Sequence, residues 1–146
     1  MEALSIFLKF LQACIAPVTM ISGVGLFLLV VTNRLGRTID RSRHLIEELD
    51  IPDIKRKSEK QNEIKVFYKR SKILRNSIAF ILIGMISSCM IIPLLFIMSF
   101  TAINLNIIGY VLFLITVISL LIALIYFFRD ILYSLHAIKL EAKDYI

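Results

Sequence analysis

Four arginines and one aspartate are concentrated in the stretch TNRLGRTIDRSR, which runs from Thr32 to Arg43. Guanidinium groups bind phosphate and also pair with carboxylates three or four residues away on a helix. The stretch follows a long uncharged run, so its arginines are placed to meet anionic lipid headgroups, each contributing about 1 kcal/mol. Two interpretations stay open: a solvated helix that sets topology, and a headgroup or partner site formed by Arg34, Arg37, Arg41 and Arg43.

A second group of chemically distinctive residues shares one face of the helix that leads into this stretch. At about 100° per residue, one sector contains Thr19, Ser22, Gly25, Leu26, Leu29, Thr32, Asn33, Gly36 and Asp40. Small residues let helices approach closely, which favours a packing face. Hydroxyl groups, a hydrophobic constriction at Leu26 and Leu29, and a polar inner mouth also fit a pore lining, although the packing face is the favoured interpretation.

Residues for catalysis are lacking in the long apolar segments. These segments contain no Asp, Glu, Lys, Arg or His, so a proton relay, an intramembrane protease or a charged transport site has no reacting groups. His44 and His136 are far apart in sequence, and Cys14 and Cys89 are not spaced for a metal. Basic residues alternate with acidic ones, which argues against nucleic-acid binding. We expect no enzyme activity, metal or cofactor.

The composition indicates an all-α integral membrane protein. Of the 146 residues, 58% are hydrophobic and 19% charged, whereas soluble domains are about half apolar and a quarter charged. A bilayer core of about 30 Å needs about 20 apolar residues in a helix. Three segments of a single membrane domain (1–146) meet this requirement: 13–32, 78–100 and 107–128.

The distribution of basic residues predicts the topology. Residues 33–76 contain 13 basic and seven acidic side chains, whereas the turn at 101–106 has no charge. The positive-inside rule places 33–77 and the tail 129–146 in the cytoplasm and the N-terminus outside. We expect a multi-pass protein of the bacterial inner (plasma) membrane.

Residues 33–77 are predicted to form a cytoplasmic helical hairpin that extends from the first and second spans. Its helices are joined by a turn at 49–53, which contains Pro52. Apolar residues at a/d spacing predict a coiled-coil seam on both limbs: Leu35, Ile39, Ile46 and Leu49 on the first, Ile64, Phe67, Leu74 and Ile78 on the second.

Self-association is also expected. Gly84-x-x-x-Ser88 and Ser119-x-x-x-Ala123 add small-residue contact faces to the second and third spans. Three helices can scarcely enclose a pore alone, so a pore would require several copies of the chain. These features favour a homo-oligomer.

Residues 16–43, APVTMISGVGLFLLVVTNRLGRTIDRSR, resemble the signature of a bacterial family catalogued as domain of unknown function 2721. The stretch YKRSKILRNSI, residues 68–78, also resembles that family's return limb. The motifs that carry the resemblance are an Ala-Pro-Val start, a Ser-Gly-x-Gly core and an arginine-rich exit: Ala16, Pro17, Val18, Ser22, Gly23, Gly25, Arg34, Leu35, Arg37, Asp40, Arg41 and Arg43. The resemblance implies a small multi-span membrane protein and supplies no activity.

Two functions follow as hypotheses. The first is a homo-oligomeric inner-membrane protein whose first span lines a passive ion-conducting pore. The second is a non-conducting scaffold or accessory subunit whose arginine-rich hairpin binds anionic lipid headgroups or a partner protein. The expected partners are therefore the lipid bilayer, further copies of the chain and anionic headgroups.

Overall fold

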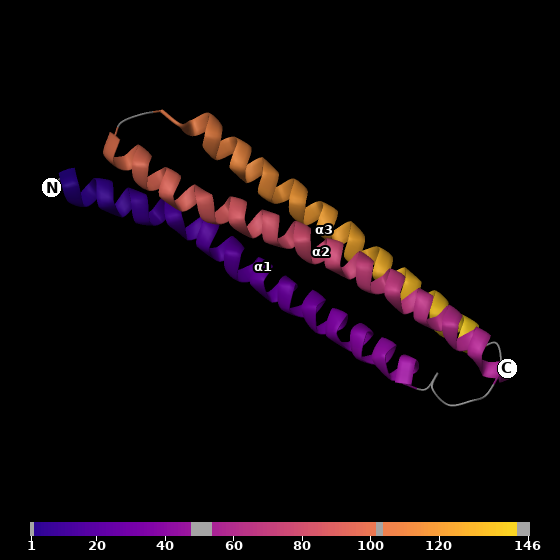
Figure 1. The fold of residues 1–146 in the computed structure, drawn as a ribbon. Coiled ribbons are helices and arrows are strands. Elements are labelled where there is room, and N and C mark those ends of the chain that lie inside the picture. The colour runs from indigo at the N-terminus through magenta and orange to yellow at the C-terminus, as the bar shows by residue number, and fades with distance from the viewer. Residues whose placement is uncertain (1, 48–53, 102–103, 143–146) are drawn as a thin grey trace. The chain divides into compact units, whose positions relative to one another are not determined.

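The computed structural model describes residues 2–47, 54–101 and 104–142, with side chains at 4–47, 62–99, 101 and 104–135. These residues form three helices and no strand, which confirms the all-α class (Figure 1). The helices are α1 (Glu2–Glu47), α2 (Ile54–Thr101) and α3 (Asn106–Ala142).

All three helices are long and apolar enough to cross a membrane. The segments with this property lie within Leu4–Glu47, Asn62–Ser99 and Asn106–Leu135, which confirms three candidate spans and a membrane protein. α1 and α2 continue from apolar into charged sequence without a break, as predicted. The predicted turn at 49–53 lies outside the described residues.

α1 begins earlier than the predicted first span. It starts at Glu2, so Pro17 lies well inside the helix and not in its first turn. Proline has no N–H, and the carbonyl of Ala13 therefore lacks its usual helical donor. Pro17 is buried, and Ala13 and Pro17 both line a cavity described below.

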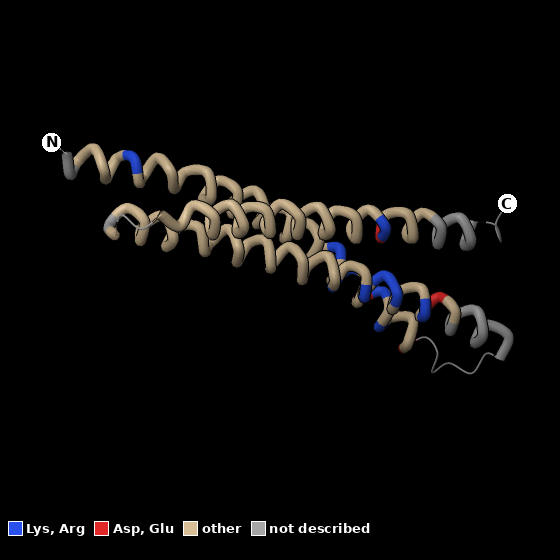
Figure 2. The backbone as a smooth tube through the Cα atoms, turned by 90° about the horizontal axis from the view of Figure 1, so that it is seen from above, with Lys and Arg blue, Asp and Glu red and all other residues tan. Residues whose placement is uncertain are grey.

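The chain divides into two compact units, and each helix contributes to both. The apolar unit comprises Met1–Leu28 and Ala79–Ile122, and the charged unit comprises Leu29–Ile78 and Ala123–Ile146. Glu2 and Lys9 are the charged residues of the apolar unit, and every other charge in the sequence belongs to the charged unit. Figure 2 shows this segregation as long tan stretches on each helix followed by blue and red positions.

Small residues bring α2 and α3 together in the apolar unit. A Cβ added to Gly84 would lie 3.5 Å from the carbonyl oxygen of Thr116 and from the Leu120 side chain. Ser87 donates to the carbonyl of Leu112 at 3.3 Å, and Ser88 and Ser119 are buried. The small-residue faces of α2 and α3, which were expected to favour self-association, are therefore buried within the chain.

The charged unit is a bundle of three helices, because α3 continues past the predicted end of its span at residue 128. Ser77 on α2 donates to the carbonyl of Ala123 on α3 at 2.8 Å. The predicted hairpin thus has a third helical partner. Much of the tail predicted at 129–146 is helix, since α3 ends at Ala142.

The third helix changes which face of α1 is buried. The predicted seam residues Ile39 and Ile46 are 37% and 51% exposed, whereas Val31, Thr38 and Leu45 are buried at heptad spacing. The predicted seam was therefore wrong at Ile39 and Ile46, whereas Leu35 is half-buried and Leu49 lies outside the described residues. On α2 the buried residues share only Leu74 with the predicted seam: Arg70, Ile73, Leu74, Ser77, Ile81, Gly84, Ser87 and Ser88.

Candidate functional site

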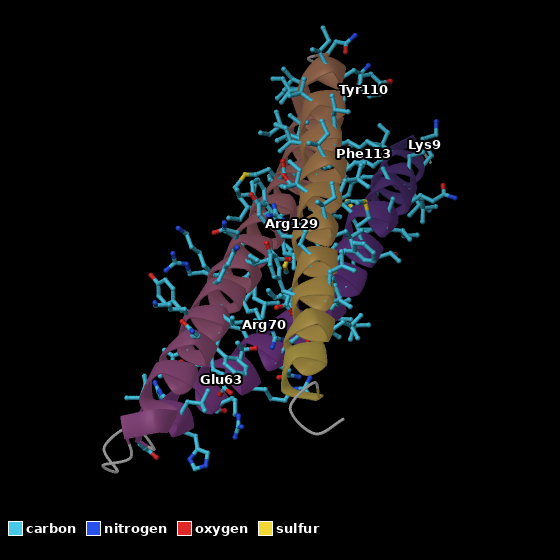
Figure 3. All side chains as sticks on the ribbon, turned by 90° about the vertical axis from the view of Figure 1, so that its right-hand side faces the viewer. Lys9, Glu63, Arg70, Tyr110, Phe113 and Arg129 are labelled. Atoms are coloured by element: carbon cyan, nitrogen blue, oxygen red, sulfur yellow. The ribbon has the colours of Figure 1, made fainter. Side chains whose placement is uncertain are left out.

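A fully buried carboxylate joins the three helices of the charged unit. Asp130 on α3 is 0% exposed. Arg34 on α1 donates from Nε to its Oδ2 at 2.5 Å, and Arg70 on α2 donates from Nε to its Oδ1 at 3.1 Å. Figure 3 shows Arg70 on the side of α2 that faces α3. We call these three residues the Arg–Asp–Arg triad.

The helical periodicity explains why the two arginines point inward. Arg34 lies three residues after Val31 and four before Thr38, both buried on the inner face of α1. Arg70 lies four residues before Leu74, which is 0% exposed on the inner face of α2. Both arginines therefore lie on the buried faces of their helices.

Aromatic rings surround the arginines of the triad. The guanidinium carbon of Arg34 is 5.6 Å from the centre of the Phe127 ring, and that of Arg70 is 5.6 Å from the centre of the Phe67 ring. Nearby, Lys69 Nζ lies 4.9 Å from the centre of the Tyr133 ring. The face of an aromatic ring attracts cations, so these rings stabilise guanidinium groups that have been removed from water.

The triad holds helices together and leaves no carboxylate oxygen open to a substrate. Removing a carboxylate from water is costly, and two cations with good geometry offset that cost. One partner comes from each helix, so the triad fixes which side chains of α1 and α2 meet α3. We assign it a structural role.

The structure distinguishes among the four arginines predicted to contact headgroups. The Arg34 side chain is 25% exposed and bonded to Asp130. Arg37, Arg41 and Arg43 are all exposed. Arg34 therefore has a partner within the chain, which the sequence reasoning missed because Asp130 lies two residues beyond the predicted third span.

The sequence carries a partial signal for the triad, which does not by itself choose the partners of Asp130. Asp130 follows the apolar run of α3, and Arg34 lies only two residues beyond the predicted end of the first span. A lone acidic residue next to the end of a span needs a cation nearby, because burial of an unpaired charge is prohibitive. That rule does not choose between the adjacent Arg129 and arginines close to the ends of the other spans.

The predicted pore-lining or packing face of α1 is uncovered in each unit, with Thr19 to Leu26 in the apolar unit and Leu29 to Asp40 in the charged unit. We call this set the α1 face; all nine residues are exposed or half-buried: Thr19, Ser22, Gly25, Leu26, Leu29, Thr32, Asn33, Gly36 and Asp40. Leu26 and Leu29 are 68% and 55% exposed. A Cβ at Gly25 or Gly36 would meet nothing within 4 Å. The small residues of α1 therefore do not serve packing within the chain.

The hydroxyl groups on the α1 face bond to their own helix. Thr19 donates to the carbonyl of Ile15 at 2.8 Å, and Ser22 donates to that of Val18 at 3.1 Å. Thr32 donates to the carbonyl of Leu29 at 3.0 Å. Each oxygen still has lone pairs with which to accept a hydrogen bond. These hydroxyl groups are therefore compatible with either an apolar environment or contact with water.

The apolar unit contains a cavity of about 500 Å³ between its three helices. Its lining includes Pro17 and Met20 of α1, Leu95 of α2, and Tyr110 and Phe113 of α3, the last two of which are labelled in Figure 3. None of its twelve lining residues is acidic, basic, serine or cysteine. The mainly apolar lining suits an apolar chain.

The described residues contain no group of three side chains suited to metal binding. His44 Nδ1 lies 3.9 Å from Glu47 Oε2 on the same helix, and both side chains are exposed. One such pair is common on solvated helices. The free thiols of Cys14 and Cys89 are not paired with each other.

A comparison with known protein families gives one match. The family described as "Protein of unknown function (DUF2721)" matches residues 14–140, which is most of the chain. The chain belongs to this family, which confirms the resemblance drawn from residues 16–43. No curated protein and no solved structure matches the chain.

Proposed function

We propose that this member of the DUF2721 family assembles into a homo-oligomer through the α1 face. The observation that carries the proposal is the contrast between the three small-residue faces. Those of α2 and α3 are buried at Gly84, Ser88 and Ser119 within the chain, whereas that of α1 is uncovered. Small residues on an uncovered membrane helix favour close approach of another helix.

The assembly encloses a pore-like centre that conducts ions passively. The α1 face begins with the hydroxyls of Thr19 and Ser22, continues through Leu26 and Leu29, and ends with polar residues. Its hydroxyl oxygens keep acceptor capacity after bonding to the helix backbone. The two leucines form a hydrophobic constriction that gates by dewetting.

Ion flux into liposomes tests the pore. Leu26→Ser or Leu29→Ser wets the constriction and raises flux about tenfold or more, because a hydroxyl replaces an apolar barrier. Leu121→Ser on α3 is the matched control, since Leu121 is exposed to a similar extent outside the α1 face. Unchanged flux in both α1 variants, or an equal rise in the control, would count against conduction.

A second candidate function is a non-conducting scaffold that binds anionic headgroups or a partner protein through Arg37, Arg41 and Arg43. The exposure of these three arginines, in contrast with Arg34, favours it. Charge reversal at Arg37 and Arg41 should then abolish binding to vesicles containing phosphatidylglycerol or to the partner. Retained binding in the double variant contradicts this candidate.

The charge distribution supports a location in the bacterial inner membrane with residues 33–77 and the C-terminus cytoplasmic. The charged unit exposes two acidic residues, Asp40 and Glu47. It exposes eight basic residues: Arg37, Arg41, Arg43, Lys65, Lys69, Lys72, Arg75 and Arg129. These counts refer to the side chains that the structure describes. Such an excess favours the cytoplasmic side.

A further inference from the structure

We propose that a groove between α1 and α2 in the charged unit binds the phosphate of an anionic lipid headgroup. The groove has a volume of about 180 Å³ and is lined by Leu35, Ile39, Tyr68, Ser71, Lys72 and Arg75. None of these residues was predicted to contact headgroups. The inference goes beyond the second candidate function, because it places headgroup binding in this groove and not at Arg37, Arg41 and Arg43.

The α2 wall of the groove has the chemistry that a phosphate diester requires. Lys72 and Arg75 are cationic, and Ser71 and Tyr68 add hydroxyl donors. Among the described side chains, neither Lys72 nor Arg75 forms an ion pair, in contrast with Arg34 and Arg70. Two cations with no acidic partner on one groove wall leave positive charge for an external anion.

The α1 wall supplies an apolar surface opposite the cations. Leu35 and Ile39 line the groove, and Ile39 is the residue that was wrongly predicted to pack in a coiled-coil seam. A lipid presents a phosphate next to glycerol and the ester ends of its acyl chains. The cationic wall can bind the phosphate, and the aliphatic wall can contact the glycerol and the ester ends of the acyl chains. Free phosphate would contact the cationic wall alone.

The position of the groove along α2 matches the headgroup layer. Lys72 and Arg75 precede Ala79, the first α2 residue of the apolar unit, by seven and four residues. At 1.5 Å per residue these separations are about 10 Å and about 6 Å. The headgroup layer on each side of a bilayer is about 5–8 Å thick. A lipid whose chains lie beside the apolar helices can therefore reach these side chains with its phosphate.

The volume of the groove is sufficient for a phosphate ester. A water molecule occupies about 30 Å³ of the liquid, so the groove holds the equivalent of about six waters. That space accepts a phosphate ester and part of a glycerol.

Native mass spectrometry of the full-length protein tests the proposal. The protein is solubilised in detergent with equal amounts of phosphatidylglycerol and phosphatidylcholine, and the retained lipid is identified and titrated. The wild type should retain phosphatidylglycerol in preference to phosphatidylcholine. Lys72→Gln with Arg75→Gln should weaken retention about 30-fold, on the basis of about 1 kcal/mol for each cation.

Two matched variants separate the groove from general surface charge. Arg37→Gln with Arg41→Gln removes the same number of cations from exposed positions on α1 and should weaken retention less than threefold. Ile39→Trp fills the groove without changing charge and should weaken retention about tenfold. A normal thermal melting temperature for each variant shows that the fold is intact.

The outcomes are distinguishable. An equal loss in both double variants overturns the groove and supports headgroup attraction by the exposed arginines. Retention unchanged in every variant overturns both the groove and that candidate function. Displacement of phosphatidylglycerol by inorganic phosphate at an equal concentration also overturns the lipid assignment, because it shows a site for free phosphate.

Discussion

Arg34 donates from Nε to Oδ2 of Asp130 at 2.5 Å, although 96 residues separate them in the sequence. The other carboxylate oxygen accepts from Arg70, so one buried acid connects all three helices of the charged unit. Two cations and one anion leave a net positive charge beside aromatic rings. This arrangement makes the fold of the charged unit depend on a single carboxylate.

Asp130→Asn should destabilise the protein by about 3–5 kcal/mol, because it leaves two arginines without their buried counter-charge. The measurement is the free energy of unfolding in mixed micelles. Asp40→Asn is the control, since Asp40 is exposed in the same unit and should change stability by less than about 0.5 kcal/mol. Similar effects of the two variants would contradict the role assigned to Asp130.

Replacing the whole triad by apolar residues should restore most of that stability. The variant Arg34→Met, Arg70→Met and Asp130→Leu removes all three charges together and avoids any unpaired charge. Exchange of a buried ion triad for apolar side chains is often neutral or stabilising. The unfolding free energy of the triple variant should lie well above that of Asp130→Asn. A triple variant as unstable as the single one would show that the charges themselves supply the stability.

Two buried serines on α2 should respond differently to removal of their hydroxyl groups. Ser77→Ala removes the donor to the Ala123 carbonyl and should cost about 1 kcal/mol. The Ser88 hydroxyl is buried with no hydrogen-bond partner among the described residues, so Ser88→Ala should be neutral or stabilising. Thermal melting of both variants in one detergent gives the comparison. A greater loss in Ser88→Ala would indicate a partner for that hydroxyl.

Two glycines should separate folding from self-association. Gly84→Leu forces a side chain against the Thr116 carbonyl and Leu120, and overpacking of this kind costs about 1–3 kcal/mol. Gly25→Leu meets nothing within the chain and should leave the melting temperature of the monomer unchanged. It should instead reduce the oligomeric fraction in size-exclusion chromatography with light scattering. An oligomer that tolerates Gly25→Leu would remove Gly25 from the interface.

The sequence alone predicted the elements better than their contacts. The three spans followed from the length of the apolar segments. The unbroken helix at Thr32 followed from the lack of a helix-breaking residue there. Both are local properties of the sequence. The buried face of α1 did not follow, because Leu35 and Ile39 fit a heptad as well as Val31 and Thr38 do. The choice between these registers depends on α3, a partner distant in sequence.

In the candidate site, too, some features follow from the sequence of one helix and others depend on a helix that is distant in the sequence. The α1 face was predictable from periodicity on one helix. The pairing of Arg34 with Asp130 was not, since an arginine next to a membrane span serves headgroup binding and burial with a carboxylate equally well. Only the approach of α3 selects between them.

The mass of the detergent-solubilised wild-type protein tests the central claim, self-association through the α1 face, most directly. Native mass spectrometry or light scattering should give a single closed assembly of four or more copies, enough to enclose a pore. A monomer or dimer across detergents and protein concentrations would contradict the pore and leave the groove at Lys72 and Arg75 as the site to study.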